Sequence, residues 1–550
     1  MTTHDGVVPW PEDLAFAYRT AGCWQGRPLG AYLWDWADAW GPRIAVVDGG
    51  RRLTYRQLAE RADALAERLS QRGFRRGDSL LVQLPNCAEF LVVAFACFRL
   101  GVAPVMMLPQ HREHELTAIA MHVGARALVV PDVWRGYDHQ ALAHRVVARL
   151  PGKVEVLVVG AGVQPGGVDV QALSDPGPDA EARRHRLDAV APPASAVALF
   201  LLSGGTTAVP KVIARTHDDY EYNVRRCSEV CRFDRDTVYL AALPVGHNFP
   251  LANPGVLGTL YRGGRVVMLP SPRPDLAFAA IERERVTATS VVPAVAVRWM
   301  EAAADPGPDL SSLRHLHIGG SPLAPELAAV IGTAFGCKLQ QVYGMAEGLV
   351  CYTAVDAPRG TTLQTQGRPI SPFDDLVVVH PVTGLELPAG EVGELLTRGP
   401  YTPRGYYRSP EQNAVSYTRD GWYRTGDLVR ITPAGDVVVC GRIKDVVNRG
   451  GEKISAAEVE TLAQELPEVA EAAVVAVPDP VLGERVCLVV RPHPGRRPTL
   501  DGVTAALAAR GLAAFKLPER LVVLDDLPHT AVGKPDKKAL RRLLAARVQP

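Results

Sequence analysis

The sequence predicts an α/β fold in which a large N-terminal domain of helix-covered sheets is followed by a smaller α+β domain. Short apolar runs alternate with stretches of helical period through most of the chain, which favours parallel sheets covered by helices. The 550 residues also exceed what one compact core usually contains. The rhythm restarts near Gly441, and the roughly one hundred residues that follow are a usual size for a separate domain. We therefore predict a core domain at 1–441 and a C-terminal domain at 442–550.

In the N-terminal domain, short apolar runs predict strands, and apolar residues at helical spacing predict helices. The strands are expected at 79–84, 154–159, 197–202, 238–243, 265–269 and 313–318. The helices are expected at 56–71, 88–100 and 276–285. Residues 174–193 are polar and rich in proline, which predicts a surface connection.

The same patterns continue in the C-terminal domain. They predict a helix at 456–465, strands at 472–477 and 485–490, a helix at 500–510 and a basic helix at 537–547.

Composition excludes several classes of protein. Sixty basic and 59 acidic side chains give a formal net charge of +1, so there is no bulk electrostatic reason to expect a nucleic acid or an anionic membrane as partner. The apolar stretch 80–108 is interrupted by prolines and charged residues and does not fit a bilayer span. The N-terminal residues show no export signal, and we expect a cytoplasmic protein.

Two residue types are used in an informative way. The nine cysteines include no CxxC pair, and Cys227 and Cys231 lack the second pair of ligands that a structural zinc site needs. We expect reduced, mostly buried thiols. Lysine supplies only nine of the sixty basic residues, and this scarcity favours a functional role for a lysine that lies inside a motif.

The segment 201–211, LLSGGTTAVPK, is an apolar strand that runs into a loop of small residues and ends at Lys211. Such a loop suits a polyphosphate, because glycines let backbone amides approach the oxygens and hydroxyl groups add donors. The lysine supplies a positive charge. The alternative is a flexible turn. The loop does not match the GxxxxGK[ST] nucleotide motif.

Four further motifs follow in order: QVYGMAE at 341–347, WYRTGD at 422–427, GRIKD at 441–445 with NRGGEK at 448–453, and a GK pair ending at Lys534. Together they resemble the adenylate-forming superfamily of acyl- and aryl-acid ligases over nearly the whole chain. Additional segments resemble one branch, the stand-alone 2,3-dihydroxybenzoate- and salicylate-AMP ligases of siderophore pathways. These segments are 8–11, 215–219, 243–255 and 398–402.

This resemblance implies an enzyme that forms aryl-AMP from ATP and a hydroxy-aromatic acid with Mg²⁺. It then passes the aryl group to the phosphopantetheine thiol of a separate carrier protein. Glu347 would bind the metal, Tyr343 would lie against the adenine, and Asp427 would accept hydrogen bonds from the ribose. The whole implied nucleotide set is Ser203, Gly204, Gly205, Thr206, Thr207, Lys211, Gly320, Tyr343, Glu347, Asp427 and Arg442.

The resemblance also assigns the catalytic role. Lys534 would lie between the acid carboxylate and the α-phosphate and offset the repulsion between two anions that must meet. The family's C-terminal domain first delivers this lysine and then rotates to admit the thiol, and Lys444 matches the hinge position. His247 is grouped with the catalytic residues, and a gate or a packed aromatic is its alternative reading.

The acid pocket implied by the resemblance contains Asn248, Phe249, Asn253, Gly319 and Val350. Asn248 offers an amide donor, and Phe249 can pack against an aromatic ring. Two positions depart from the family pattern. Ala208 replaces a usual glycine of the phosphate loop. Asn253 replaces a small serine or cysteine, which predicts a preference away from 2,3-dihydroxybenzoate and towards acids such as 3-hydroxypicolinate or 3-hydroxyanthranilate.

Two other functions fit the same motifs. An acid–CoA ligase shares the adenylation residues and differs in the acceptor of the acyl group. A degenerate module kept for partner binding would have lost a functional residue among Lys211, Glu347, Asp427 and Lys534, and all four are present.

Overall fold

The computed structural model describes residues 5–203, 210–303, 307–320, 323, 325–443, 446–528 and 535–547. It confirms the α/β class: in the described residues, three larger sheets with covering helices and one two-stranded ribbon precede residue 443, and a separate sheet follows.

A seven-stranded sheet has the order β11-β10-β4-β3-β5-β8-β9. Its strands are β3 (Ser79–Val82), β4 (Ala103–Met106), β5 (Ala127–Pro131), β8 (Glu155–Val159), β9 (Gly167–Asp169), β10 (Val197–Ser203) and β11 (Lys211–Thr216). All neighbours are parallel except β10 and β11, which pair antiparallel with Ser203 opposite Lys211. This register places the two ends of the predicted phosphate loop side by side.

A nine-stranded sheet has the order β18-β17-β16-β15-β14-β12-β13-β1-β2. Its strands are β1 (Ile44–Asp48), β2 (Arg51–Thr54), β12 (Val238–Ala241), β13 (Arg265–Met268), β14 (Ala288–Val291), β15 (His315–Gly319), β16 (Lys338–Gly344), β17 (Val350–Tyr352) and β18 (Arg368–Pro369). Strands β12, β14, β15 and β16 are parallel, so their carboxyl ends share one edge, where ligands of open α/β sheets usually bind.

A four-stranded antiparallel sheet completes the N-terminal part. Its strands are β19 (Asp375–Val379), β20 (Gly393–Arg398), β21 (Tyr423–Ile431) and β22 (Val437–Arg442). A two-stranded ribbon is formed by β6 (Val133–Trp134) and β7 (Tyr137–Asp138).

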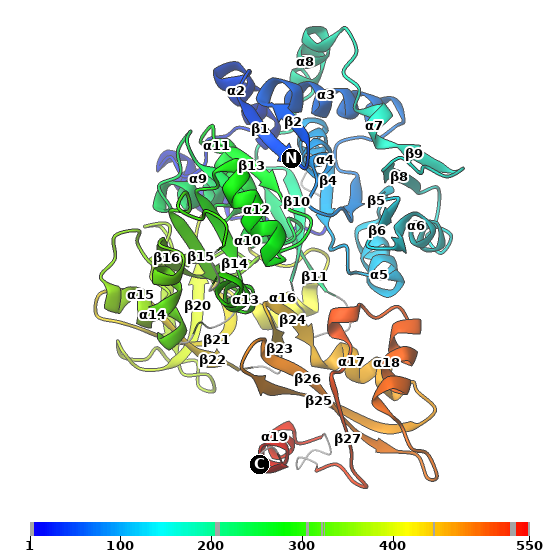
Figure 1. Ribbon diagram of the computed structural model, residues 1–550, viewed down its shortest axis with the longest axis vertical. Helices are drawn as coiled ribbons and strands as arrows, with labels where there is room; N and C mark the ends of the chain where they lie inside the picture. Colours follow the sequence, from blue (N-terminus) through cyan, green and yellow to red (C-terminus); the bar gives the residue numbers. More distant parts are fainter. Residues whose placement is uncertain are drawn as a thin grey trace.

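The helices lie around and between these sheets (Figure 1). Every residue of α4 (Ala88–Leu100) is buried, including Arg99, whose Nε donates to Asp63 of α3 (Tyr55–Gln71) at 2.7 Å. The other helices are α1 (Glu12–Thr20), α2 (Leu29–Trp40), α5 (Glu113–Val123), α6 (His139–Val147), α7 (Val170–Leu173), α8 (Ala180–Asp188), α9 (His217–Val230), α10 (Asn248–Ala252), α11 (Gly255–Tyr261), α12 (Pro274–Glu284), α13 (Pro293–Ala303), α14 (Pro325–Ala334), α15 (Arg359–Gln364) and α16 (Pro410–Ser416).

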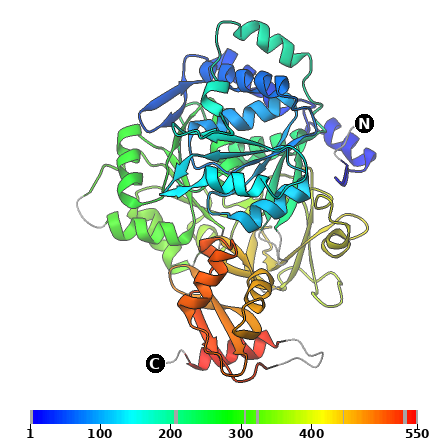
Figure 2. The same ribbon diagram turned by 90° about the vertical axis from the view of Figure 1, so that its right-hand side faces the viewer.

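The C-terminal part forms its own five-stranded sheet, with its own apolar core. Its elements are β23 (Val446–Arg449), β24 (Glu452–Ser455), α17 (Ala456–Gln464), β25 (Val469–Asp479), β26 (Gly483–Pro492), α18 (Leu500–Ala509), the 3₁₀ turn η1 (Ala514–Lys516), β27 (Arg520–Val523) and α19 (Lys537–Arg547). Figures 1 and 2 show this part as a separate lobe, with β24 and α17 turned towards the N-terminal part and α19 at the far end.

The connection expected at 174–193 contains a helix, α8. Two of its residues hold the helix against the rest of the fold. The side chain of Leu187 is buried, and Arg183 is buried with its Nε 3.0 Å from Glu67 of α3. Because these contacts are made with distant residues, the proline-rich local sequence gives no sign of them.

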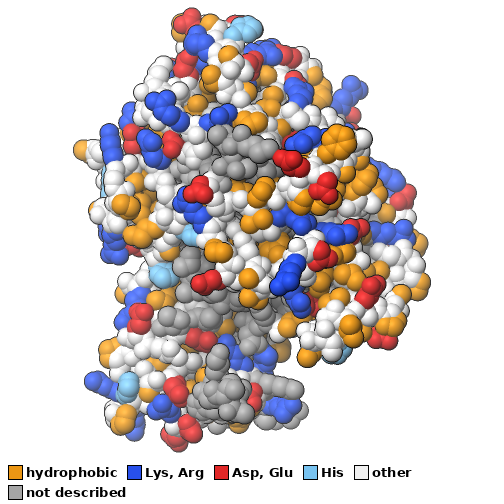
Figure 3. Space-filling view, turned by 180° about the vertical axis from the view of Figure 1, so that it is seen from behind, with side chains coloured by type: hydrophobic (Ala, Val, Ile, Leu, Met, Phe, Trp, Pro, Cys, Tyr) orange, Lys and Arg blue, Asp and Glu red, His pale blue; other side chains and the backbone are white. Residues whose placement is uncertain are grey.

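The surface and the thiols agree with the composition. On the face in Figure 3, basic and acidic side chains lie interspersed. All nine cysteines are free, six are buried, and Cys440 on β22 is exposed. In the described part of the chain, no helix combines the length and the apolar character needed to cross a bilayer.

Candidate active site

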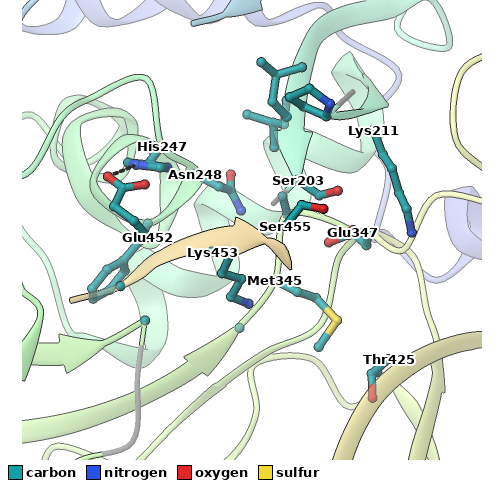
Figure 4. Close-up of a pocket in the computed structure, with 18 of the residues that line it drawn as sticks. Ser203, Lys211, His247, Asn248, Met345, Glu347, Thr425, Glu452, Lys453 and Ser455 are labelled. Carbon is teal, nitrogen blue, oxygen red and sulfur yellow. Dashed lines mark hydrogen bonds and ion pairs between the residues drawn. The ribbon is translucent and has the colours of Figure 1, made fainter. Parts of the chain in front are cut away.

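A cavity of about 590 Å³ lies between the carboxyl edge of the nine-stranded sheet and the C-terminal lobe (Figure 4). On the N-terminal side it is lined by the ends of β10 and β11, by α10, by the residues after β16, and by β21. On the C-terminal side it is lined by the β23–β24 hairpin and by η1. Both parts of the chain therefore contribute walls to one site.

The anion-binding end of the cavity contains Ser203, Lys211 and Glu347. Tyr406 connects two of them, because its hydroxyl donates to Glu347 Oε1 at 2.8 Å and lies 3.5 Å from Lys211 Nζ. The lysine ammonium also lies 4.5 Å from the centre of the Tyr406 ring, a cation–π distance. Burial raises the pKa of Tyr406 well above its usual value, so the phenol remains a donor. Gly204, Gly205, Thr206, Thr207 and Ala208 lie outside the described residues.

Asp427 on β21 also lines the cavity. Its Oδ2 accepts a hydrogen bond from the hydroxyl of Tyr343 at 2.8 Å, and its backbone N–H donates to Thr425 Oγ1 at 3.0 Å. Tyr343 is not among the lining residues and meets the site through Asp427. Arg442 pairs with Asp427 in the β21–β22 register, and the position of its side chain is not described.

The other end of the cavity is formed by α10, which begins after His247 and ends at Asn253. Asn248, Phe249 and Asn253 all line the cavity. The Asn248 Oδ1 accepts from the hydroxyl of Tyr220 at 2.8 Å, whereas its Nδ2 is buried without a hydrogen-bond partner. An orphaned buried donor is costly, so this group is suited to meet a ligand acceptor.

Two residues of the predicted acid pocket lie behind the cavity surface. Val350 on β17 is fully buried and does not line the cavity. Gly319 does not line it either, although its neighbour Gly320 does. A Cβ at Gly319 would lie 2.7 Å from the carbonyl oxygen of Val342 and 3.4 Å from the Phe249 ring. The glycine therefore leaves space for Phe249 instead of touching a ligand itself.

The C-terminal lobe approaches this end of the cavity through the turn between β23 and β24. Gly451 has a φ of +97°, and a Cβ there would lie 2.7 Å from Val292 Cγ1. Gly320 has a φ of +85°, and its carbonyl oxygen accepts a hydrogen bond from Asn448 Nδ2 at 3.3 Å. Two glycines thus permit a close backbone approach that larger residues would obstruct.

Lys516 of η1 joins the two lobes through a buried cluster of charges. Its Nζ lies 2.8 Å from Glu458 of α17 and 3.2 Å from Glu115 of α5. Each of the three side chains is 5% exposed or less. Burial alone would lower the pKa of Lys516, but the two carboxylates outweigh it and raise the pKa. The lysine therefore stays charged, and it is shared between a carboxylate of its own lobe and one of the N-terminal lobe.

A second ion pair crosses between the lobes: His247 Nε2 lies 3.2 Å from Glu452 Oε1 (Figure 4). Burial opposes the charged imidazolium, but the charge of Glu452 and its hydrogen bond raise the pKa of His247 above its usual value. The pKa of Glu452 is lowered, since His247 outweighs the opposing effect of burial. Lys453 acts against protonation of His247, and Lys516 favours the ionised form of Glu452, whereas burial lowers the pKa of the neighbouring His111 to about 4 and leaves it neutral at pH 6–8.

We expect this pair to make the contact between the lobes weaken as the pH rises from 6 to 8. The ion pair contributes fully to the free energy of the contact between the lobes below the ordinary histidine pKa of about 6.5. This contribution is lost as the pH rises through the raised pKa of His247. Because His247 is more than a third exposed, the pair is worth at most about 1 kcal/mol, or roughly a fivefold change in population. Small-angle scattering across this pH range should show an expanding wild-type protein and a nearly constant Glu452→Gln variant. Identical profiles for the two proteins would contradict the expectation.

Sequence reasoning missed several residues of the cavity. Tyr406, Glu452, Lys453 and Lys516 all line it, although none was assigned to the site. The rarity of lysine was a usable signal for Lys453 and Lys516, which are two of only nine lysines. Glu452 belongs to the NRGGEK motif at 448–453, which was a usable signal as well, whereas Tyr406 lies in none of the motifs. Lys444 and Lys534 lie outside the described residues, so their predicted roles stay predictions.

Comparison with protein families gives two matches along the chain. The model for the AMP-binding enzyme matches residues 33–407, and the model for the AMP-binding enzyme C-terminal domain matches residues 458–534. The chain belongs to the AMP-binding enzyme family. It is an adenylate-forming ligase, and enzymes of this family use ATP and Mg²⁺.

Individual relatives cover almost the whole of this AMP-binding enzyme. It is 54% identical over 542 residues to a salicylyl-CoA synthase / salicylate adenylyltransferase of a Streptomyces species, covering 98% of each chain. It is 47% identical over 543 residues to the 2,3-dihydroxybenzoate-AMP ligase of Bacillus subtilis (strain 168), covering 99% of this chain and 98% of the relative. Among solved structures, the apo structure of Mycobacterium smegmatis MbtA is similar, with a TM-score of 0.75, 44% identity and 98% coverage of both chains.

Proposed function

We propose that this AMP-binding enzyme activates a hydroxy-aromatic carboxylic acid and then transfers the aryl group to the phosphopantetheine thiol of a separate carrier protein. One observation supports the acid class most directly. The cavity is lined by the amide residues Asn248 and Asn253 and by the aromatic residue Phe249, all from α10 and its C-terminal end, and also by the carboxylates Glu347 and Asp427. An aromatic acid with polar substituents matches the first group of residues, and a nucleotide matches the second.

In the first half-reaction, a carboxylate oxygen of the acid attacks the α-phosphorus of ATP. The bond to the β-phosphate oxygen breaks, pyrophosphate leaves, and an aryl–AMP anhydride remains. The acid is already ionised at neutral pH, so no general base is needed, and positioning and charge neutralisation dominate. Lys211 supplies positive charge at the phosphates, and Asp427 accepts from the ribose hydroxyls.

A magnesium ion fits the anion-binding end. Glu347 turns its carboxylate to the cavity, where one oxygen is oriented by the Tyr406 hydroxyl at 2.8 Å. Within the described residues no group of three or more potential metal ligands occurs, and magnesium at nucleotide sites is usually bound by one or two carboxylates together with phosphate oxygens and water. Glu347 would hold the ion, which would neutralise charge on the triphosphate.

We assign the observed arrangement of the lobes to the second half-reaction, in which the thiol attacks the aryl carbonyl and AMP leaves. The β23–β24 hairpin places Lys453 against the cavity, whereas the last described residue that lines it is Lys516. Helix α19, which follows the GK motif, lies at the far end of the C-terminal lobe (Figure 2). A rotation of 442–550 about Lys444 would exchange this hairpin for the loop that contains Lys534.

Two molecules are candidates for the acceptor of the aryl group, a carrier protein and coenzyme A. The name of the Streptomyces relative includes both a CoA synthase and an adenylyltransferase activity, so coenzyme A is the second candidate. Both acceptors present the same phosphopantetheine thiol. A direct comparison of free coenzyme A with a phosphopantetheinylated aryl carrier protein, using the same preformed adenylate, separates them. We expect the carrier to give the higher kcat/KM.

Acid-dependent exchange between ATP and labelled pyrophosphate tests the first half-reaction. The panel contains salicylate, 2,3-dihydroxybenzoate, 3-hydroxypicolinate, 3-hydroxyanthranilate and, as a control, aliphatic acids of similar size. We expect exchange only with the aromatic acids, and less with 2,3-dihydroxybenzoate than with salicylate or the nitrogen-containing acids, since Asn253 replaces a smaller residue. Exchange with no aromatic acid would overturn the proposed function. A best rate with 2,3-dihydroxybenzoate would overturn the predicted effect of Asn253.

A further inference from the structure

The side chain of Asn253 is held by a hydrogen-bond pattern that uses its oxygen completely. Asn253 Oδ1 accepts from Asn223 Nδ2 of α9 at 2.9 Å and lies 3.7 Å from Cys227 Sγ. Burial raises the pKa of Cys227 well above its usual value, so its sulfur carries a proton and can only donate to this oxygen. The two donors occupy the two acceptor positions of the amide oxygen.

The orientation of the Asn253 amide follows from a neighbouring backbone group. Asn223 Nδ2 also donates to the carbonyl oxygen of Ala252 at 3.1 Å. Because that carbonyl can only accept, the NH₂ group of Asn223 must face it, and its second N–H is directed at Asn253. The atom that faces Asn223 must therefore be the oxygen of Asn253, and a rotated amide would oppose two NH₂ groups.

The backbone of Asn253 is fixed as well. Its N–H donates to the carbonyl oxygen of Phe249 at 3.2 Å, and its carbonyl oxygen accepts from the hydroxyl of Tyr352. The residue lines the cavity, and its Nδ2 is not one of the buried side-chain atoms that lack a hydrogen-bond partner. Within the described residues, the hydrogen bonds of this side chain are made by its oxygen, and its nitrogen donates none. The only fixed polar group that Asn253 offers to the cavity is thus an N–H donor.

We propose that Asn223 is a positioning residue for substrate selection: it locks Asn253 so that the aryl pocket offers a hydrogen-bond donor to one edge of the acid. The inference rests on the proposed function and narrows its substrate class. The preferred acid carries an acceptor at that edge, such as a ring nitrogen or the oxygen of a methoxy group. An amino substituent, which donates, is disfavoured there. Of the two nitrogen-containing candidates, the structure favours a pyridine carboxylate over an amino-substituted benzoate.

The strength of the selection follows from the burial of the site. Asn253 is 3% exposed and Asn223 is fully buried, so water reaches the amide only through the cavity. An acid that brings an apolar group to Nδ2 leaves a desolvated donor without a partner, and one that brings an amino group opposes two donors. We expect about a tenfold loss in kcat/KM for either mismatch.

The experiment uses substituent pairs of equal size on salicylate, at each free ring position, in the pyrophosphate exchange assay. Methoxy is compared with ethyl, and amino with methyl, so that size cancels within each pair. At one ring position we expect methoxy to exceed ethyl by about tenfold, with amino no better than methyl. In Asn253→Leu the methoxy preference should fall to about one.

Asn223→Leu gives the decisive result, because it leaves Asn253 in place but frees its amide to rotate. We expect the methoxy preference to fall to about one while kcat for unsubstituted salicylate stays within a few-fold of wild type. Glu229→Gln, a partly exposed change on the same helix, is the control and should keep the preference.

Two results overturn the proposal. One is a methoxy-to-ethyl ratio near one at every position in the wild type. The other is a wild-type ratio that survives in Asn223→Leu or in Asn253→Leu. A uniform loss of activity with all acids in Asn223→Leu, at an unchanged ratio, belongs to the second result and indicates a merely structural role. If no acid supported exchange, the proposed function would be wrong, and this inference would be wrong with it.

Discussion

Replacing Lys516 by methionine should slow transfer of the aryl group by on the order of a hundredfold while changing pyrophosphate exchange only a few-fold. The substitution keeps the length of the side chain but removes the charge between Glu115 and Glu458. Breaking a buried ion pair by removing one partner costs about 3–5 kcal/mol. Glu115 belongs to the N-terminal lobe and Lys516 to the C-terminal lobe, so a rotation of the C-terminal lobe would separate them, and we expect the cost to fall on the arrangement that we assign to the transfer step. The two half-reactions are measured separately, by exchange and by single-turnover transfer from preformed aryl-AMP.

Glu115→Gln is the matched variant, because it disturbs only the contact between the lobes. The pair of Lys516 with Glu458 remains, and a glutamine oxygen can still accept from the backbone N–H of Arg112. We expect the same selective loss of transfer, with a smaller magnitude. If both half-reactions fell by the same factor in both variants, the charge cluster would be a general element of stability and not a contact that favours one arrangement. Thermal unfolding of each variant distinguishes a loss of folding from a shift between arrangements.

Two lysines of the C-terminal lobe should show opposite effects on the two half-reactions. In Lys534→Ala we expect adenylate formation to fall by about 10²–10³-fold with ATP binding retained, because a charge that stabilises the meeting of two anions is removed. In Lys453→Ala we expect exchange to stay within a few-fold of wild type and transfer to slow, because Lys453 lines the cavity in the arrangement assigned to transfer. Each variant serves as the control for the other, since both remove one lysine from the same lobe.

The contradicting outcomes of this pair are distinct. Full adenylation activity in Lys534→Ala would remove the catalytic assignment made from the sequence. A loss of exchange in Lys453→Ala, equal to that in Lys534→Ala, would mean that the β23–β24 hairpin serves the first half-reaction. The assignment of the observed arrangement would then be wrong.

Local patterns predicted the elements of this fold well. The helix expected at 88–100 is α4 with the same bounds, and the basic helix expected at 537–547 is α19. Their apolar spacing and their flanking residues lie within a few positions of each other, so a single sequence contains the information. The order of strands in the sheets, and the helix within 174–193, depend on distant contacts and were not predicted.

The predicted site was accurate where a motif is contiguous and incomplete where two segments meet. Glu347 and Asp427 were found because each belongs to a recognisable run of residues, and both line the cavity. Glu115 was not predicted as a partner of Lys516, because it lies 401 positions away in the sequence and reads as an ordinary acidic residue at a helix start. Asn223 reads as a polar residue within a helix, and only the fold places it beside Asn253.

Because Cys440 is exposed, the native chain offers a labelling site from which a rotation of the lobes can be measured. This thiol lies on β22, shortly before the connection between the lobes, and it is the exposed one among nine cysteines that are all described. Burial raises the pKa of the half-buried Cys87 and Cys337, so their thiolate fractions at neutral pH are small. A nitroxide or fluorophore carrying an iodoacetamide group should therefore attach first at Cys440, without prior removal of the other thiols. With a second label on α19, distance distributions could be followed through a catalytic cycle.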